Sequence, residues 1–407
     1  MISVDDALAQ ICGSLTPLGA EQVSLGDAHG RVLAEDLAAR RTQPPFAVSA
    51  MDGYAVRAAD IENLPRKLRL VGYVPAGGRH EGTVGPGEAV RIFTGARLPD
   101  GADAVVIQED TDAGDGEILV NDTVGPFHPG RHVRQAGIDF VEGQIGLTAG
   151  RRLTARDVGL AAAMNRPWLL VHRRPRVAIL PTGDEVALPG DPIGPNQIVS
   201  SNGSALGALV TACGGVPIQL GIARDDSDTL KTMAQGAAGA DLLVTIGGAS
   251  VGEHDLVKKA LGEIGLSVDF WKIAMRPGKP LMFGRLGATA VLGLPGNPVS
   301  ALVCGMLFLR PAIERLQGLP GAGPVLEPAL AGTDLKANDG RQDYLRARLS
   351  RDADGGLVAS AFAKQDSSMM SALAGADCLI VRPPLAPAVA TGDRVKIIRL
   401  SDSHASV

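Results

Sequence analysis

The stretch from Leu242 to Pro298 decides the fold, and it contains LLVTIGGASVGEHDLVKKAL (242–261), FWKIAMRPGKPLMF (270–283) and AVLGLPGNPVSALV (290–303). The short apolar runs within it, LLVTI, PLMF and AVLGL, are typical of buried strands. The first and third runs lead into glycine-rich turns that are followed by helical patterns. This order predicts an α/β sheet with a ligand-binding edge.

In such sheets, ligands bind outside the carboxyl ends of the strands, where the N–H groups of helix starts favour anions. Three glycines allow the backbone to approach a ligand here: Gly247, Gly248 and Gly252. Asp255 stands at the start of the next helical pattern, and Asn297 with Pro298 is typical of a helix cap and first turn. The nearby basic residues are Lys272, Arg276 and Lys279. This mixture of groups favours a phosphorylated substrate whose reaction is assisted by a metal.

From Arg176 onward, strand and helix patterns alternate, which predicts a doubly wound parallel α/β sheet. RVAILPTGDEV (176–186) and VPIQLGIARDD (216–226) both read as strands that end in acidic turns, and Asn202 is a candidate cap for the helix between them. Five acids follow strands in this way: Asp184, Glu185, Asp225, Asp226 and Asp255. They are all expected at the edge where ligands bind.

The rest of the chain predicts three further parts around this domain. Ser3 and Thr154 begin helical patterns with an acid three residues on, and residues 54–137 show the short alternating runs of a small β module. After residue 319, short strands return and predict a small β-barrel. We therefore expect a helical support (1–43 and 138–171), an inserted β module (44–137), the α/β domain (172–318) and a C-terminal β-barrel domain (319–407).

The composition excludes several classes of protein. A chain of 407 residues is expected to form two to four domains. Its 3% aromatic content and net charge of -5 argue against nucleic acid as a partner. The four cysteines have no paired spacing, the N-terminus lacks the pattern of a signal peptide, and no apolar run has the length of a membrane span. We expect a cytoplasmic protein with no membrane partner.

Six motifs together carry a family resemblance: PPFAVSAMDGYAV, RIFTGARLPDGADAVV, LPTGDEV, TIGGASVGEHD, MRPGKPLMFG and GLPGNPVSALV. In order and spacing, the chain resembles the molybdopterin molybdenumtransferases of the MoeA type, a group that also includes gephyrin's E domain. The resemblance spans residues 1–400, which is almost the whole chain. It implies a fold of these four parts, in which the helical support is elongated and the doubly wound α/β domain is of the molybdopterin-binding type.

The resemblance also implies a reaction and its partners. Members of the family insert molybdate into adenylylated molybdopterin and release AMP, which yields molybdenum cofactor. A divalent metal, usually Mg²⁺, assists. The family resemblance further implies a homodimer whose site lies between the α/β domain of one subunit and the β module of the other.

Carried over by motif, the family's functional residues are the acids Asp52, Glu185, Asp225 and Asp255, together with Thr94, Lys272, Arg276, Pro295, Pro298 and Ser367. We expect Glu185 and Asp255 to be the metal ligands and Asp225 to lie near the nucleotide. Molybdate is expected at Lys272, Arg276 and Ser367. Arg276 stands where some members have lysine, so a planar guanidinium group replaces a compact ammonium charge.

Each of these residues also has a purely structural interpretation. Asp255 could cap a helix, Asp52 and Asp225 could form turns, and Glu185 could be solvated. Thr94 could bond the backbone, the three basic residues could form a solvated face, and Ser367 could be an ordinary loop serine. Two other functions stay open. The chain could be a molybdopterin adenylyltransferase that uses ATP, or a non-catalytic scaffold.

Overall fold

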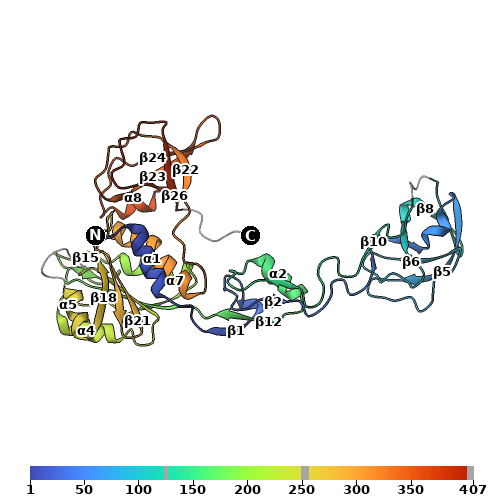
Figure 1. Ribbon diagram of the computed structural model, residues 1–407, viewed down its shortest axis with the longest axis horizontal. Helices are drawn as coiled ribbons and strands as arrows, with labels where there is room; N and C mark the ends of the chain where they lie inside the picture. The colour runs from blue at the N-terminus through green and yellow to red at the C-terminus, as the bar shows by residue number, and fades with distance from the viewer. Residues whose placement is uncertain (123–126, 249–255, 401–407) are drawn as a thin grey trace.

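The protein is elongated, with an α/β part and a barrel at one end, a β module at the other end, and a slender support between them (Figure 1). The computed structural model describes residues 1–122, 127–248 and 256–400. Within these ranges, no helix has the length and apolar character needed to cross a bilayer.

The α/β part contains a sheet whose strand order, among the described residues, is β16-β13-β17-β21-β20-β18. The strands are β13 (Arg176–Pro181), β16 (Val216–Gln219), β17 (Leu242–Ile246), β18 (Leu266–Trp271), β20 (Met282–Leu286) and β21 (Thr289–Leu294). Strands β16, β13, β17 and β21 pair in parallel, whereas β20 pairs antiparallel with both β21 and β18. The PLMF segment therefore leads into a strand that runs against its neighbours, because an apolar run carries no information about direction.

Helices cover both faces of this sheet, which confirms the doubly wound arrangement. On one face lie α1 (Val4–Ser14), α3 (Asn202–Ala212), α6 (Pro298–Cys304) and α7 (Arg310–Leu316). On the other lie α4 (Ser227–Gln235) and α5 (Leu256–Glu263). Alternate residues of β13 divide between the two cores, since Val177 and Ile179 face the first and Ala178 and Leu180 the second.

Helix α1 lies in a different place from the one that the sequence suggested. Its cap is as expected, because the Ser3 hydroxyl accepts the Asp6 N–H at 3.0 Å. However, its buried residues Val4, Ala7 and Ile11 pack into the α/β core instead of joining the support. The segment 1–43 is thus divided between the two parts.

The support is built mainly of paired strands. Strand β1 (Ala20–Ser24) pairs with β12 (Trp168–His172), and β2 (Leu37–Ala38) pairs with β11 (Ile145–Leu147). Helix α2 (Ala155–Ala163) packs on them, and it begins at the expected cap, where Thr154 and Asp157 form a reciprocal capping box. Only this α-helix occurs in the described residues 15–43 and 138–172, so the predicted helical support is largely β structure.

The β module is a sheet in the order β7-β4-β6-β5-β9-β8 among the described residues. Its strands are β4 (Gly53–Val56), β5 (Arg66–Val74), β6 (Glu88–Ile92), β7 (Ala104–Ile107), β8 (Thr111–Ala113) and β9 (Glu117–Val120). Two chain segments connect the module to the support, and they pair with each other. Strand β3 (Val48–Ser49) pairs with β10 (Val133–Arg134), and the Gln43 N–H donates to the Phe140 carbonyl at 2.9 Å.

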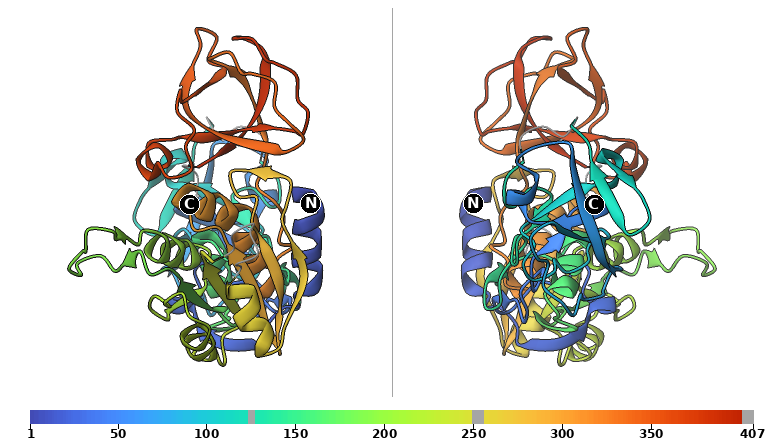
Figure 2. Two further views of the ribbon diagram at one scale, coloured as in Figure 1. Left: turned by 90° about the vertical axis from the view of Figure 1, so that its left-hand side faces the viewer. Right: turned by 90° about the vertical axis from the view of Figure 1, so that its right-hand side faces the viewer.

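The C-terminal part is a closed barrel, as predicted. In the continuously described stretch 256–400, five strands close through the pairing of β23 with β25: β22 (Glu327–Ala331), β23 (Gln342–Arg351), β24 (Leu357–Ala361), β25 (Cys378–Arg382) and β26 (Arg394–Arg399). Strand β19 (Met275–Arg276), from the α/β part, pairs with β23. Helix α8 (Met370–Ala374) follows the loop that carries Ser367. The barrel stands on the α/β part in both views of Figure 2.

Candidate active site

A cavity of about 1110 Å³ lies at the carboxyl edge of the α/β sheet. Segments that follow β13, β17 and β21 line it, together with the start of α3 and the loop before α8. Seven of the predicted site residues are among its lining: Glu185, Asp225, Gly247, Gly248, Pro295, Asn297 and Pro298. Pockets of about 300–1,000 Å³ hold drug-sized ligands, so this one is large enough for a substrate with two joined halves.

The acids at this edge have unequal surroundings. The Asp225 N–H donates to Asp184 Oδ1 at 3.3 Å, and burial raises the pKa of the Asp225 carboxyl, as do the charges of Asp184 and Glu185. The next residue, Asp226, does not line this cavity; it caps α4 by accepting the Thr229 N–H at 2.8 Å. Asp225 is therefore the acid of this pair that lines the cavity.

The glycines after β17 allow close packing of the turn. Gly247 and Gly248 have φ of 89° and 65°, in the left-handed region, and a Cβ on Gly248 would lie 2.3 Å from Val257. The neighbouring Thr182 hydroxyl is buried without a hydrogen-bond partner among the described residues, and Thr182 lines the cavity. The predicted residues Gly252 and Asp255 lie outside the described residues.

The turn before α6 is held by side chains from two other segments. Asn297 occupies the cap position, but its Nδ2 donates to Ser367 Oγ at 2.9 Å instead of its side chain capping the helix. The Val299 N–H donates to the Ser367 carbonyl at 3.1 Å. Asn202 was expected to cap α3, which is wrong: Ser201 is the cap residue, and Asn202 Nδ2 donates to the Gly296 carbonyl at 2.6 Å. Ser367 therefore adjoins the cavity turn without lining the cavity.

The loop that carries Ser367 is anchored in the barrel by Arg346. This arginine is almost fully buried, and its Nη2 donates to the Asp366 carbonyl at 3.1 Å. Gln365 bonds the Arg346 backbone on both sides, with its Oε1 accepting the N–H at 3.0 Å and its Nε2 donating to the carbonyl at 2.9 Å. A buried cation that holds a loop fixes the position of Ser367 beside the cavity.

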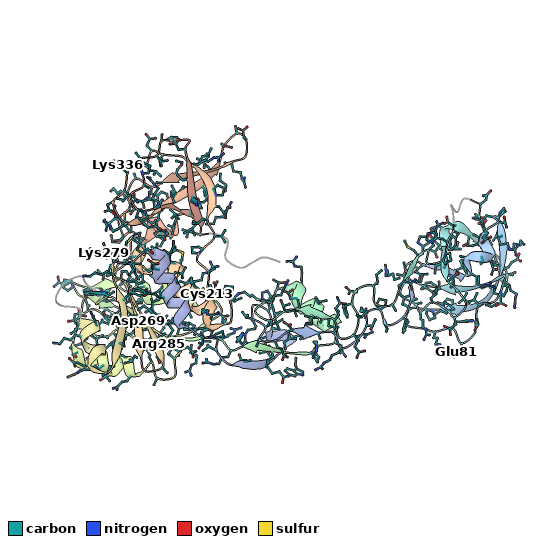
Figure 3. The ribbon with its side chains drawn as sticks, in the orientation of Figure 1. Glu81, Cys213, Asp269, Lys279, Arg285 and Lys336 are labelled. Atoms are coloured by element: carbon teal, nitrogen blue, oxygen red, sulfur yellow. The ribbon has the colours of Figure 1, made fainter. Side chains whose placement is uncertain are left out.

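None of the three predicted cations, Lys272, Arg276 and Lys279, lines the cavity. Lys272 follows β18, and its Nζ lies 4.2 Å from the centre of the Trp271 ring. Arg276 pairs with Asp339 at 2.6 Å and lies 3.7 Å from Asp343, so its charge is already compensated. Lys279 lies between the α/β part and the barrel (Figure 3). A different lysine, Lys259 of α5, does line the cavity.

Asp52 and Thr94 lie in the β module, which is at the opposite end of the elongated molecule from the α/β part and its cavity (Figure 1). Asp52 Oδ1 accepts both the N–H and the hydroxyl of Thr94, each at 2.8 Å. These bonds hold the pKa of the Asp52 carboxyl below its ordinary value. One chain thus brings Asp52 and Thr94 together, but not with Glu185 and Asp225.

The Thr94→Val variant tests this pairing directly. Removal of the hydroxyl leaves one of the two bonds that stabilise the carboxylate, so the pKa of Asp52 should rise toward its ordinary value. Proton binding to Asp52 should then occur at higher pH than in the wild type. An NMR titration of the Asp52 carboxyl carbon measures this shift, and an unchanged midpoint would contradict the assigned hydrogen bond.

Several lining residues gave little or no signal in the sequence. Thr182, Ser200, Ile198, Val199, Lys259 and Met370 all line the cavity. Ile198 and Val199 form β15, which pairs with β14 (Val186–Ala187) in a segment that projects from the α/β part (Figure 2). Only Thr182 carried a usable signal, because it follows a strand directly in the same way as Gly247 and Pro295.

The donor set at the cavity fits Mg²⁺. Among the described residues, no group of three or more His, Cys, Asp or Glu side chains is arranged to hold a metal ion. Mg²⁺, however, keeps several waters and binds through one or two carboxylates together with substrate phosphates. A cation near Glu185 and Asp225 would also relieve the repulsion that raises the pKa of Asp225.

The doubly wound sheet, with a cavity at its carboxyl edge, places the α/β part among the α/β domains that bind phosphorylated ligands at this edge. Comparison with known families is more specific. Residues 2–165 match the MoeA N-terminal region (domain I and II), residues 178–315 a probable molybdopterin binding domain, and residues 328–400 the MoeA C-terminal region (domain IV). The chain belongs to the MoeA family.

Similar proteins extend over nearly the whole chain. A molybdopterin molybdenumtransferase from Haemophilus influenzae is 34% identical and aligns over 98% of each chain. One from a Nostoc species is 38% identical over 85% of this chain and 81% of its own. A crystal structure of a molybdopterin biosynthesis MoeA protein from Pyrococcus horikoshii is 32% identical, covers 99% of this chain and 100% of its own, and has a TM-score of 0.85.

Proposed function

We propose that this protein is a molybdopterin molybdenumtransferase, which inserts molybdate into adenylylated molybdopterin and releases AMP. This is the final step of molybdenum cofactor synthesis. The observation that carries the proposal is the cavity at the carboxyl edge of the sheet, where Glu185 and Asp225 meet glycine turns and the start of α6. The similarity of the chain to enzymes of this name supports the same reaction.

The cavity acids act on the phosphate end of the substrate. Mg²⁺, when bound, would draw charge from the pyrophosphate and make AMP a better leaving group. Glu185 and Asp255 are the proposed metal ligands, and Asp225 is placed near the nucleotide. Partial burial and the charges of Asp184 and Glu185 raise the pKa of the Asp225 carboxyl, and a cation at this edge would favour its charged form.

Molybdate, as the second substrate, is a doubly charged oxyanion that requires cations and hydrogen-bond donors. We propose Lys272, Lys279 and Ser367 as its main contacts. Arg276 is expected to contribute less, because an anion would have to compete with Asp339 and Asp343 for its guanidinium. Lys259 joins this group because it lines the cavity.

The location of Asp52 and Thr94 supports a site shared by two copies of the chain. They lie too far along the molecule to reach the α/β cavity of their own copy (Figure 1). In a homodimer with two-fold symmetry, the module of each copy could face the cavity of the other. We propose this arrangement, and with it the four-part division of the chain, in which the module is inserted into the support.

All four cysteines are free thiols, which favours the cytoplasm.

Purified protein tests the function when it is supplied with adenylylated molybdopterin, molybdate and Mg²⁺. We expect AMP release together with formation of molybdenum cofactor, and loss of both when a chelator removes Mg²⁺. Addition of excess Mg²⁺ should restore them. AMP and cofactor are both measured by chromatography.

Two results would contradict the proposal. Consumption of ATP with unadenylylated molybdopterin would identify an adenylyltransferase. A folded dimer without turnover of either substrate would favour a scaffold.

A further inference from the structure

Among the described residues that line the α/β cavity, none is aromatic, so they offer no aromatic face for stacking. The whole chain has only eight Phe, three Tyr and two Trp residues. A substrate that joins a pterin to an adenine nucleotide presents two fused rings, for which aromatic faces are the usual protein contact. The chain should supply such a face from another place.

The β module carries an aromatic and cationic cluster that has no other assigned role. Arg91 of β6 lies opposite Tyr54 of β4 on one side and opposite Tyr73 of β5 on the other, so the three residues form one row across the sheet. Phe93 follows two residues after Arg91. The Arg91 guanidinium lies 4.8 Å from the centre of the Phe93 ring and 4.9 Å from that of Tyr54, within the range of cation–π contacts.

The ring of Tyr73 completes this cluster at the surface. Its centre lies 5.3 Å from that of Phe93 in an edge arrangement, and Tyr73 is 62% exposed. Gln108 further fixes Arg91, because its Oε1 accepts from Arg91 Nη2 at 2.5 Å. An exposed ring that packs against a second ring, which in turn contacts a fixed arginine, is a preorganised stacking surface.

This cluster adjoins the Asp52–Thr94 pair. Thr94 follows Phe93 in the chain, Asp52 precedes β4, and the charge of Arg91 helps to lower the pKa of the Asp52 carboxyl. Met51, beside Asp52, is also exposed. The functional pair of the module therefore lies at the border of an apolar, cationic surface.

We infer that Tyr73, Phe93 and Arg91, here called the aromatic platform, bind a fused ring of the substrate while the α/β cavity of a second copy holds its phosphates. The inference rests on the proposed function and on a site shared by two copies. It names a specificity determinant for the same reaction: the cavity recognises charge, and the platform recognises a flat nitrogen heterocycle. Either the pterin or the adenine could fill this role, and binding experiments separate them.

The Tyr73→Ala variant tests the platform, with Tyr73→Phe as the conservative variant. In Tyr73→Ala, KM for adenylylated molybdopterin should rise about tenfold with kcat nearly unchanged, the loss expected for one stacked aromatic ring. Tyr73→Phe keeps the ring and should retain the wild-type KM. Calorimetry with AMP alone and with molybdopterin alone identifies the ring, because Tyr73→Ala should weaken only one of the two.

Phe46→Ala is the matched control. Phe46 is another exposed ring of the module, with the Arg97 guanidinium 5.2 Å from its centre, and this variant should keep the wild-type KM. An equal rise in KM for Phe46→Ala would overturn the inference, and so would an unchanged KM in a folded Tyr73→Ala, Phe93→Ala double variant. If the wild type inserts molybdate normally in these assays, only the platform is refuted. If the wild type is inactive, the proposed function fails first.

Discussion

Replacing Asp225 by asparagine is expected to lower the rate of molybdate insertion at least about a hundredfold without lowering thermal stability. The loss of activity follows because a neutral amide no longer adds its charge to attract the cation that Glu185 and Asp255 are proposed to hold against the pyrophosphate, an effect worth several kcal/mol. The melting temperature should not fall, because burial and the charges of Asp184 and Glu185 raise the pKa of Asp225 in the folded state, so its ionised form is slightly disfavoured at neutral pH. Asp225 is exposed, and solvent screening keeps this effect small.

Asp226→Asn is the matched control for this prediction. It removes the same charge one residue further on, but Asp226 only caps α4, and asparagine caps helices about as well as aspartate. Activity and melting temperature should both stay near those of the wild type. Equal loss of activity in the two variants would show that general charge at this edge, instead of Asp225 itself, supports the reaction.

Mixing two inactive variants should restore activity if the site is shared between copies. In a heterodimer of Asp52→Ala and Asp225→Asn chains, one of the two composite sites has an intact Asp52 and an intact Asp225. An equal mixture that re-associates at random should recover about one quarter of the wild-type activity, because half of its dimers are heterodimers with one working site each. Insertion assays on the purified heterodimer, carrying two different affinity tags, measure this directly.

The complementation experiment has its own control. Glu185 and Asp225 both line the α/β cavity. In a heterodimer of Glu185→Gln and Asp225→Asn chains, each of the two cavities therefore lacks one acid, and the heterodimer should stay inactive. Absence of activity in a verified Asp52→Ala, Asp225→Asn heterodimer would place Asp52 and Asp225 in a site within one copy, contrary to the proposed arrangement.

The sequence predicted the sheet and its edge well, because runs such as LLVTI and AVLGL are buried on both faces and end in turns that their residues specify. It did not predict the direction of β20, since an apolar run reads the same in both directions. It also missed the packing of α1, whose amphipathic pattern shows that one face is buried but not which core receives it.

For the site as well, the sequence predicted some features and missed others. Glu185, Asp225, Gly247 and Asn297 could be expected at one edge, because each directly follows or closely follows a parallel strand. Asn202 could not be placed, because its partner, the Gly296 carbonyl, is 94 residues away in the chain. The separation of Asp52 from Glu185 depends on the length of the support, and no local pattern encodes that length.

The double connection between the module and the support has a mechanical consequence. A single linker would let the module swivel about its own axis, so that Asp52 could point in any direction. Two antiparallel segments that are joined by the hydrogen bond between the Gln43 N–H and the Phe140 carbonyl resist torsion but still permit bending. The module can therefore approach a neighbouring molecule mainly by bending in one plane. This restriction reduces the orientational entropy that is lost when two copies of the chain associate.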